Sequence, residues 1–221
     1  KNNFKLKNIF PNSQSEIKFK NHQAEIIFKK DNFLINGNGE FLIQKNYNKI
    51  NYKIEKKIDN HLFDLNFNFI NNPINLDFLN YKLDDKSKAN LKLNGKFFKD
   101  KTLNFEKIKF KSGSDLITIS NLKLLDDFKI SNMKSANFNF TDSQDIKNIF
   151  QINDNDGNFI ISGKVFNANK LIEDLIFKDS QNNDIFDKDL VLSLKLKEVY
   201  LHENHAVYDL AGNLKFIENS L

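Results

Sequence analysis

The chain has 221 residues, of which 40% are hydrophobic and 28% are charged. It is long enough for one large or two small domains and too apolar for a disordered segment. The net charge of +4 comes from 33 basic and 29 acidic residues mixed along the sequence, which predicts a solvated surface and not a nucleic-acid footprint. The absence of cysteine excludes disulfides, zinc–thiolate sites and cysteine nucleophiles.

Phenylalanine is the most informative residue type, because 23 Phe in 221 residues exceed a globular average and predict a Phe-rich buried surface. Lys, Asn, Ile and Phe are all frequent and no arginine occurs, as expected of an AT-rich coding sequence. Composition therefore says little about function, and the position of each residue says more. The apolar residues fall on one phase of an alternating pattern, and Lys and Asn fall on the other.

The alternation is clearest in Asn66-Phe67-Asn68-Phe69 and in Asn137-Phe138-Asn139-Phe140. Successive side chains of a strand point to opposite faces, so such a run predicts a strand with one apolar and one polar face. In chain order, the predicted strands are residues 4–6, 17–19, 24–28, 33–36, 40–43, 50–54, 62–69, 74–78, 89–93, 103–110, 116–124, 128–131, 136–140, 159–165, 190–196, 199–201, 206–210 and 214–216.

Short links separate these strands and favour an antiparallel meander. Turns are predicted at Asn36-Gly37, Asn94-Gly95, residues 111–113 and Asp156-Gly157, where the residues tolerate a positive φ. Residues 84–87 and 180–183 are predicted to be solvated loops.

Two segments break the two-residue period. Thr141 or Asp142 would cap a short helix over residues 142–150, and Asn167 would cap a second one over residues 168–177. With the strand between them they predict a helix–strand–helix insertion at 142–178, inside one continuous unit spanning residues 1–221. Because the chain begins at Lys1 without Met, we expect a piece of a longer protein, with any membrane anchor outside these residues.

No motif predicts an enzyme or a cofactor. The residues 202–205, His-Glu-Asn-His, are interpreted as a polar hairpin loop, not a metal site, which would need at least three converging ligands. Asp156-Gly157 lies in a run that fails the spacing of a calcium loop. Lys107 and Lys109 alternate with apolar residues, but on a strand they face away from those residues, so no nucleic-acid partner is predicted.

A long amphipathic meander must cover its apolar face. It can close into a sandwich or barrel, or curl into an open trough that meets an apolar ligand. Large side chains on the apolar phase favour a roomy interior. The residues predicted to line it are Phe67, Phe69, Leu76, Phe78, Leu91, Leu93, Phe105, Phe138 and Phe140.

Residues 159–172, FIISGKVFNANKLI, resemble the strand, glycine, "FDA" and helix signature near the end of the central domain of AsmA-like proteins of the YhdP type. Asn167 stands where that family usually has aspartate, and either residue caps a helix. Residues 190–196, 199–201 and 212–216 resemble the strands that follow. The resemblance covers residues 136–216, and before them it is limited to β alternation.

The resemblance implies a repeating β-groove protein of the Gram-negative envelope, periplasmic and held in the inner membrane by an anchor outside this segment. It implies that phospholipid acyl chains and the rest of the parent polypeptide are its partners, with a role in lipid transport and outer membrane biogenesis. The alternative from the residues alone is a structural or interaction β-domain without lipid cargo, such as a closed sandwich or a spacer whose edges pair with neighbouring domains.

Overall fold

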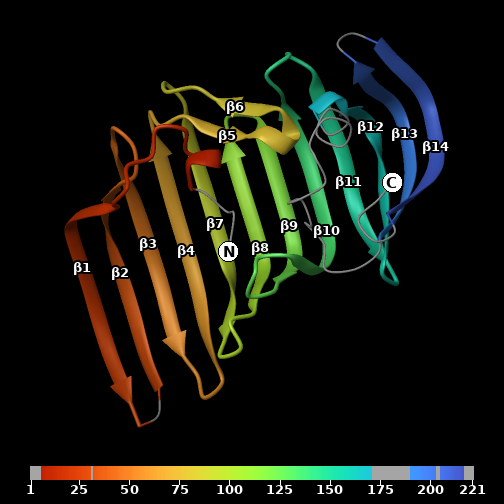
Figure 1. Cartoon of the computed structure of the whole chain (residues 1–221). Coiled ribbons are helices and arrows are strands. Elements are labelled where there is room, and N and C mark those ends of the chain that lie inside the picture. The colour runs from red at the N-terminus through yellow and green to blue at the C-terminus, as the bar shows by residue number, and fades with distance from the viewer. Residues whose placement is uncertain (1–5, 31, 171–189, 203–204, 217–221) are drawn as a thin grey trace.

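The computed structural model describes residues 6–30, 32–170, 190–202 and 205–216. The chain is mainly β: 72% of the described residues are in strands and 4% are helical, and the large sheet is open and curled, not closed into a barrel. In the described residues this sheet has the strand order β1-β2-β3-β4-β7-β8-β9-β10-β11-β12-β13-β14, while β5 and β6 form a separate hairpin. The mainly β architecture expected from the alternation is confirmed, as is the open form favoured by the large apolar residues and implied by the resemblance (Figure 1).

The elements have the following bounds. The first half of the large sheet comprises β1 (Lys18–Lys29), β2 (Asn32–Leu42), β3 (Tyr47–Lys56), β4 (Asn60–Ile70), β7 (Lys88–Phe98) and β8 (Leu103–Ser112). The second half comprises β9 (Asp115–Leu124), β10 (Ile130–Thr141), β11 (Lys147–Asn155), β12 (Asn158–Asn167), β13 (Leu190–His202) and β14 (His205–Phe216). The remaining elements are η1 (Leu6–Asn8), β5 (Ile74–Leu76), η2 (Asp77–Leu79) and β6 (Tyr81–Leu83).

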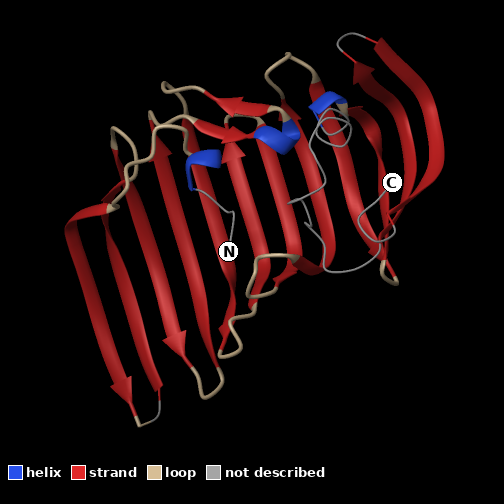
Figure 2. Ribbon diagram, viewed as in Figure 1, coloured by secondary structure: helices blue, strands red, loops and turns tan. Residues whose placement is uncertain are grey.

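Neighbouring strands of the large sheet pair antiparallel, as short turns require, except that β12 and β13 pair parallel. The connection between these two strands, residues 168–189, has the length that a parallel pairing needs. Between β4 and β7 the chain leaves the sheet to form the β5–β6 hairpin. Figure 2 shows this hairpin lying across the ends of the central strands.

Two predicted turns lie inside strands. Gly37 is in the middle of β2 and Gly95 in the middle of β7, so the predicted strands at 33–36 and 40–43 are one strand. At both positions glycine is needed for close approach and not for a positive φ. A Cβ on Gly37 would meet the Tyr52 ring, and a Cβ on Gly95 would meet the carbonyl oxygen of Asn104.

Changing Gly95 to Ala should destabilise the protein by about 1–3 kcal/mol, because the new methyl group would also lie 2.7 Å from the Phe63 ring. The matched control is Gly212→Ala in β14, where an added Cβ meets nothing within 4 Å. That control should leave stability unchanged or raise it slightly, since glycine weakens a strand. Urea denaturation measures both, and equal midpoints would show that β7 and β8 do not approach this closely.

The predicted helix over 142–150 is wrong. Residues 142–146 form a turn, and β11 begins at Lys147. The apolar residues Ile149 and Phe150 follow one another on a strand and point to opposite faces of the sheet. The second predicted helix begins within the described residues, at Asn169 and Lys170, and residues 171–177 lie outside them. The described part of the 142–178 segment therefore supplies two strands of the large sheet, β11 and β12, with no helix at 142–150.

Three smaller differences have local causes. Phe128 belongs to the turn before β10 and has a φ of 64°, so the predicted strand at 128–131 begins only at Ile130. The strand predicted at 74–78 ends at Leu76, where η2 begins. Of the strand predicted at 4–6, residues 4 and 5 lie outside the described residues, and Leu6 begins η1.

Candidate functional site

Apolar side chains face one another across the whole width of the large sheet. Residues paired on adjacent strands lie on the same face, so the register defines rows that run from strand to strand. The first apolar row is Ala24, Gly37, Tyr52, Leu65, Leu93, Ile108, Ile119, Ala136, Ile152, Ile161, Leu194 and Gly212. At a strand spacing of about 4.8 Å this row is about 50 Å long.

A second apolar row runs beside the first. It consists of Gly39, Ile50, Phe67, Leu91, Phe110, Ile117, Phe138, Phe150, Gly163, Leu196 and Leu210. On the other side of the first row, a third and shorter one consists of Ile26, Ile35, Ile54, Phe63, Gly95, Phe105, Leu122 and Met133. We call the side of the sheet that carries these rows the apolar face. β-bulges shift the register between β7 and β8 and between β11 and β12, and the rows continue from strand to strand across them.

Most of the predicted lining residues are on the apolar face. Phe67, Leu91 and Phe138 lie in the second row, Leu93 in the first and Phe105 in the third. Phe69 pairs with Ala89 and Phe140 with Asn148, one step closer to the β5–β6 hairpin. Leu76 is on β5 and packs against the core from the hairpin. Phe78 is 58% exposed on η2, so the structure does not place it in the lining.

The apolar face is not equally accessible along its length. From β8 to β13 the second row is tightly buried, with exposures of 7% or less at Phe110, Ile117, Phe138, Phe150 and Leu196. The rings there touch one another: Phe138 stacks on Phe150 with centroids 4.5 Å apart, and Phe166 contacts Phe150 at the same distance. From β2 to β7 the corresponding residues Ile50, Phe67 and Leu91 are only half-buried.

The β5–β6 hairpin closes one margin of the apolar face. Tyr81 of β6 is 1% exposed, and its ring makes edge contacts with Phe110 at 5.8 Å and Phe140 at 5.5 Å. Its hydroxyl donates to Asp115 Oδ2 at 3.3 Å. Burial raises the pKa of Tyr81, and the negative charge of Asp115 raises it further, so the hydroxyl keeps its proton for this bond.

Amide networks fix the strand ends on the same margin. Asn72 donates to Asn48 Oδ1 at 2.8 Å, and Asn48 Oδ1 also accepts from the backbone N–H of Ile70. The two amides are almost fully buried, and their hydrogen bonds join the start of β3 to the end of β4. Sequence periodicity did not reveal this cluster, because single Asn residues next to strands look like ordinary turn residues.

A second network is centred on Asp142, which is 5% exposed. Its Oδ1 accepts from the backbone N–H groups of Gln144 and Ile146, and its Oδ2 accepts from the side-chain amides of Asn148 and Asn167. Asp142 therefore ties the turn before β11 to the end of β12. The helix-capping role predicted for it is replaced by this turn.

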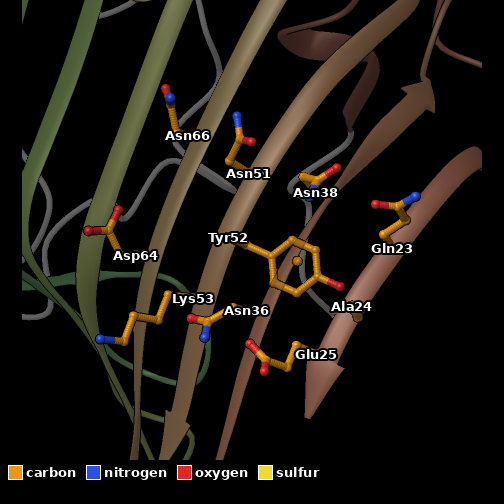
Figure 3. A pocket seen from close by; sticks show the side chains of 11 residues that line it. Gln23, Ala24, Glu25, Asn36, Asn38, Asn51, Tyr52, Lys53, Asp64 and Asn66 are labelled. Atoms are coloured by element: carbon orange, nitrogen blue, oxygen red, sulfur yellow. The ribbon is translucent and has the colours of Figure 1, made fainter.

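The opposite side of the sheet, which we call the polar face, carries Asn, Lys and Ser. On β1 to β4 it forms an open hollow of about 600 Å³. Figure 3 shows its lining side chains, which are mainly amides: Gln23, Asn36, Asn38, Asn51 and Asn66, with Glu25, Lys53 and Asp64. A smaller hollow of about 250 Å³ lies on the polar face of β9 to β12. A twisted sheet is saddle-shaped, which explains hollows on the face opposite the curled side.

Other chemistry is limited in the part of the chain that the structure describes. His202 ends β13 and pairs with His205 at the start of β14, which confirms the predicted hairpin; residues 203 and 204 lie outside the described residues. Within the described ranges, no group of three His, Cys, Asp or Glu side chains is placed to hold a metal ion. No described helix has the length and apolarity needed to cross a membrane.

Comparison with protein-family models, with curated proteins and with solved structures gives no match to this chain.

Proposed function

We propose that this chain is a section of a lipid conduit of the Gram-negative envelope, in which phospholipid acyl chains lie against the apolar face. In this proposal it works in the periplasm, joined to the rest of its parent polypeptide and held at the inner membrane by a segment outside these residues. The observation that carries the proposal is the continuity of the apolar rows from strand to strand across an open sheet. The chain would act as a passive surface, not as an enzyme.

The energetic reason is the cost of exposing hydrocarbon to water. A chain of about 16 carbons exposes methylenes worth ~0.8 kcal/mol each, which amounts to about 13 kcal/mol. An apolar surface that follows the chain removes most of this barrier without a specific pocket. One acyl chain spans about half of the ~30 Å hydrocarbon core of a bilayer, so a row of about 50 Å accommodates more than one chain length.

Within this proposal the section from β2 to β7 receives the acyl chain. Ile50, Phe67 and Leu91 are half-buried there, so hydrocarbon covers surface that is otherwise wet. From β8 to β13 the rings already pack against one another, and an acyl chain would have to displace them. Loading is therefore expected first at the β2–β7 side, with headgroups at the open margin.

The variant Phe67→Asp should reduce bound phospholipid at least tenfold, because a carboxylate in the second row would have to lie against hydrocarbon. Native mass spectrometry of the purified protein measures this as loss of the lipid mass adduct. Phe67 is half-buried beside Phe41, at a ring distance of 5.6 Å. A charge at this position therefore destabilises the sheet less than a charge at a fully buried position.

The control is Asn66→Asp, which adds the same charge to the same strand on the polar face. It should carry as much lipid as the unmodified protein. Circular dichroism checks folding, and the neutral Phe67→Gln replaces the Asp variant if that variant does not fold. Absence of lipid from the unmodified protein, or equal lipid in a folded Phe67 variant and in the control, would refute the proposal.

A second candidate function is a structural or interaction module without cargo. The tight packing of Phe110, Ile117, Phe138 and Phe150 favours it for the β8–β13 half, since these rings fill the space that a ligand would need. It predicts no lipid adduct from any variant, so the same measurement separates the two candidates.

A further inference from the structure

A group of lysines lies in the centre of the polar face, on the two adjacent strands β7 and β8. We call Lys88, Lys92, Lys107, Lys109 and Lys111 the lysine patch. Lys92 pairs directly with Lys109, while Lys107 and Lys111 follow Lys109 at two-residue spacing on the same strand, about 6.8 Å on either side. Lys109 is half-buried and the others are exposed. The sequence shows these lysines only as separate alternating runs, and the register brings them together.

The patch is not neutralised by ion pairs. Within the described ranges, carboxylates lie within 4 Å of Lys20, Lys57, Lys96, Lys99, Lys129 and Lys147, but of none of the patch lysines. The carboxylate on the same strand, Glu106, pairs with Lys96 at 2.9 Å. Like charges directly opposite on paired strands are destabilising, so the pairing of Lys92 with Lys109 weakens the sheet. Stability therefore does not explain the patch.

We propose that the lysine patch docks the polar face on an anionic bilayer surface. The cations occupy neighbouring positions on two paired strands, and lysine is a point charge that recognises spread negative charge and not one oriented phosphate. The strand N–H groups beneath them are used in the β ladder and give no anion nest. The inference is independent of the acyl-chain proposal, which concerns the opposite face.

Two features argue against a nucleic acid as the partner. The aromatic side chains of β8, Phe105 and Phe110, are on the apolar face, so the strand that carries three of the patch lysines offers no ring beside them on which a base could stack. The patch also lies in the interior of a wide sheet, and a DNA major groove admits only a helix or a two-stranded ribbon. A continuous surface of negative headgroups fits this geometry better.

Co-sedimentation of the chain with vesicles tests the inference. The protein should bind vesicles of phosphatidylcholine with about one-third phosphatidylglycerol, fail to bind pure phosphatidylcholine and lose binding when salt is raised to about 0.5 M. The double variant Lys92→Gln/Lys109→Gln should bind anionic vesicles at least ~10-fold more weakly, since each lysine near an anionic surface contributes about fivefold.

The matched control is Lys49→Gln/Lys53→Gln, which removes the same charge from the polar face of β3. It should weaken binding less than about threefold, because these lysines lie outside the patch. The inference is overturned if the unmodified protein does not bind anionic vesicles. It is also overturned if the two double variants lose binding equally, because binding then depends only on net charge. It is also overturned if a random single-stranded oligonucleotide binds more tightly than vesicles through the same lysines.

Denaturation of the same variants excludes a purely structural role. Removing the Lys92–Lys109 opposition should raise the urea midpoint slightly while vesicle binding falls. A raised midpoint with unchanged vesicle binding would show that the patch has no docking role. The lipid adduct measured by native mass spectrometry is a separate readout, so failure of either proposal can be recognised without the other.

Discussion

The variant Phe138→Asp is expected to unfold the protein or to lower its free energy of unfolding by about 5 kcal/mol or more. Phe138 is 7% exposed and stacks on Phe150 at 4.5 Å, so the change removes a buried ring and places an unpaired carboxylate among apolar side chains. Loss of a buried Phe alone costs about 3–5 kcal/mol, and the buried charge adds several more. The total free energy of unfolding of a typical domain is only about 5–15 kcal/mol. Far-UV circular dichroism with urea titration measures the effect.

The matched controls are Asn137→Asp and Asn139→Asp, which put the same group on the neighbouring positions of β10. Both residues are exposed on the polar face, and each change should alter stability by less than about 0.5 kcal/mol. A folded Phe138→Asp variant as stable as these controls would mean that the two faces of β10 do not differ, and the apolar face would lose its physical basis.

The second large effect is expected from Asp142→Ala, with a loss of about 3–5 kcal/mol. The change removes the acceptor of two backbone N–H groups and of the buried amides of Asn148 and Asn167, and unsatisfied buried donors are costly. The stability of Asp142→Asn should lie between that of the unmodified protein and that of Asp142→Ala. An amide keeps one acceptor oxygen but turns a donor toward the neighbouring amides. Urea denaturation gives the order.

The control for this series is Asp154→Ala, where the carboxylate accepts a single bond from the backbone N–H of Gly157 in a hairpin turn. It should cost about 1 kcal/mol. If Asp142→Ala costs no more than this control, the network does not hold the turn before β11 to the end of β12.

Much of the apolar face could be predicted from sequence. Alternation placed Phe67, Leu91, Leu93, Phe105 and Phe138 on one side of their strands, because side-chain direction on a strand is set locally. Phe78 was misplaced, since it follows an alternating run that ends in η2. The helix expected at 142–150 failed for a related reason: neighbouring apolar residues in a short segment suit either a helix or a strand with two partly buried faces.

The predicted turns at Gly37 and Gly95 show a second limit. An Asn-Gly pair favours a turn only when nothing else requires a residue without a Cβ, and here a ring and a neighbouring strand require it. The buried amides and the lysine patch were also beyond sequence reasoning. Both consist of residues that meet only when strands far apart in the chain are aligned.

The amino-acid sequence by itself determined that this is a β protein with an apolar and a polar side to nearly every strand, because that property depends on a two-residue period within each segment. The tertiary structure decided how the strands are aligned and that the sheet stays open. It also decided where the rings of the apolar rows pack against one another and leave no free space. Register and curvature depend on contacts between distant segments, and a shift of one residue would exchange the two faces. The continuous apolar rows and the lysine patch are products of that alignment.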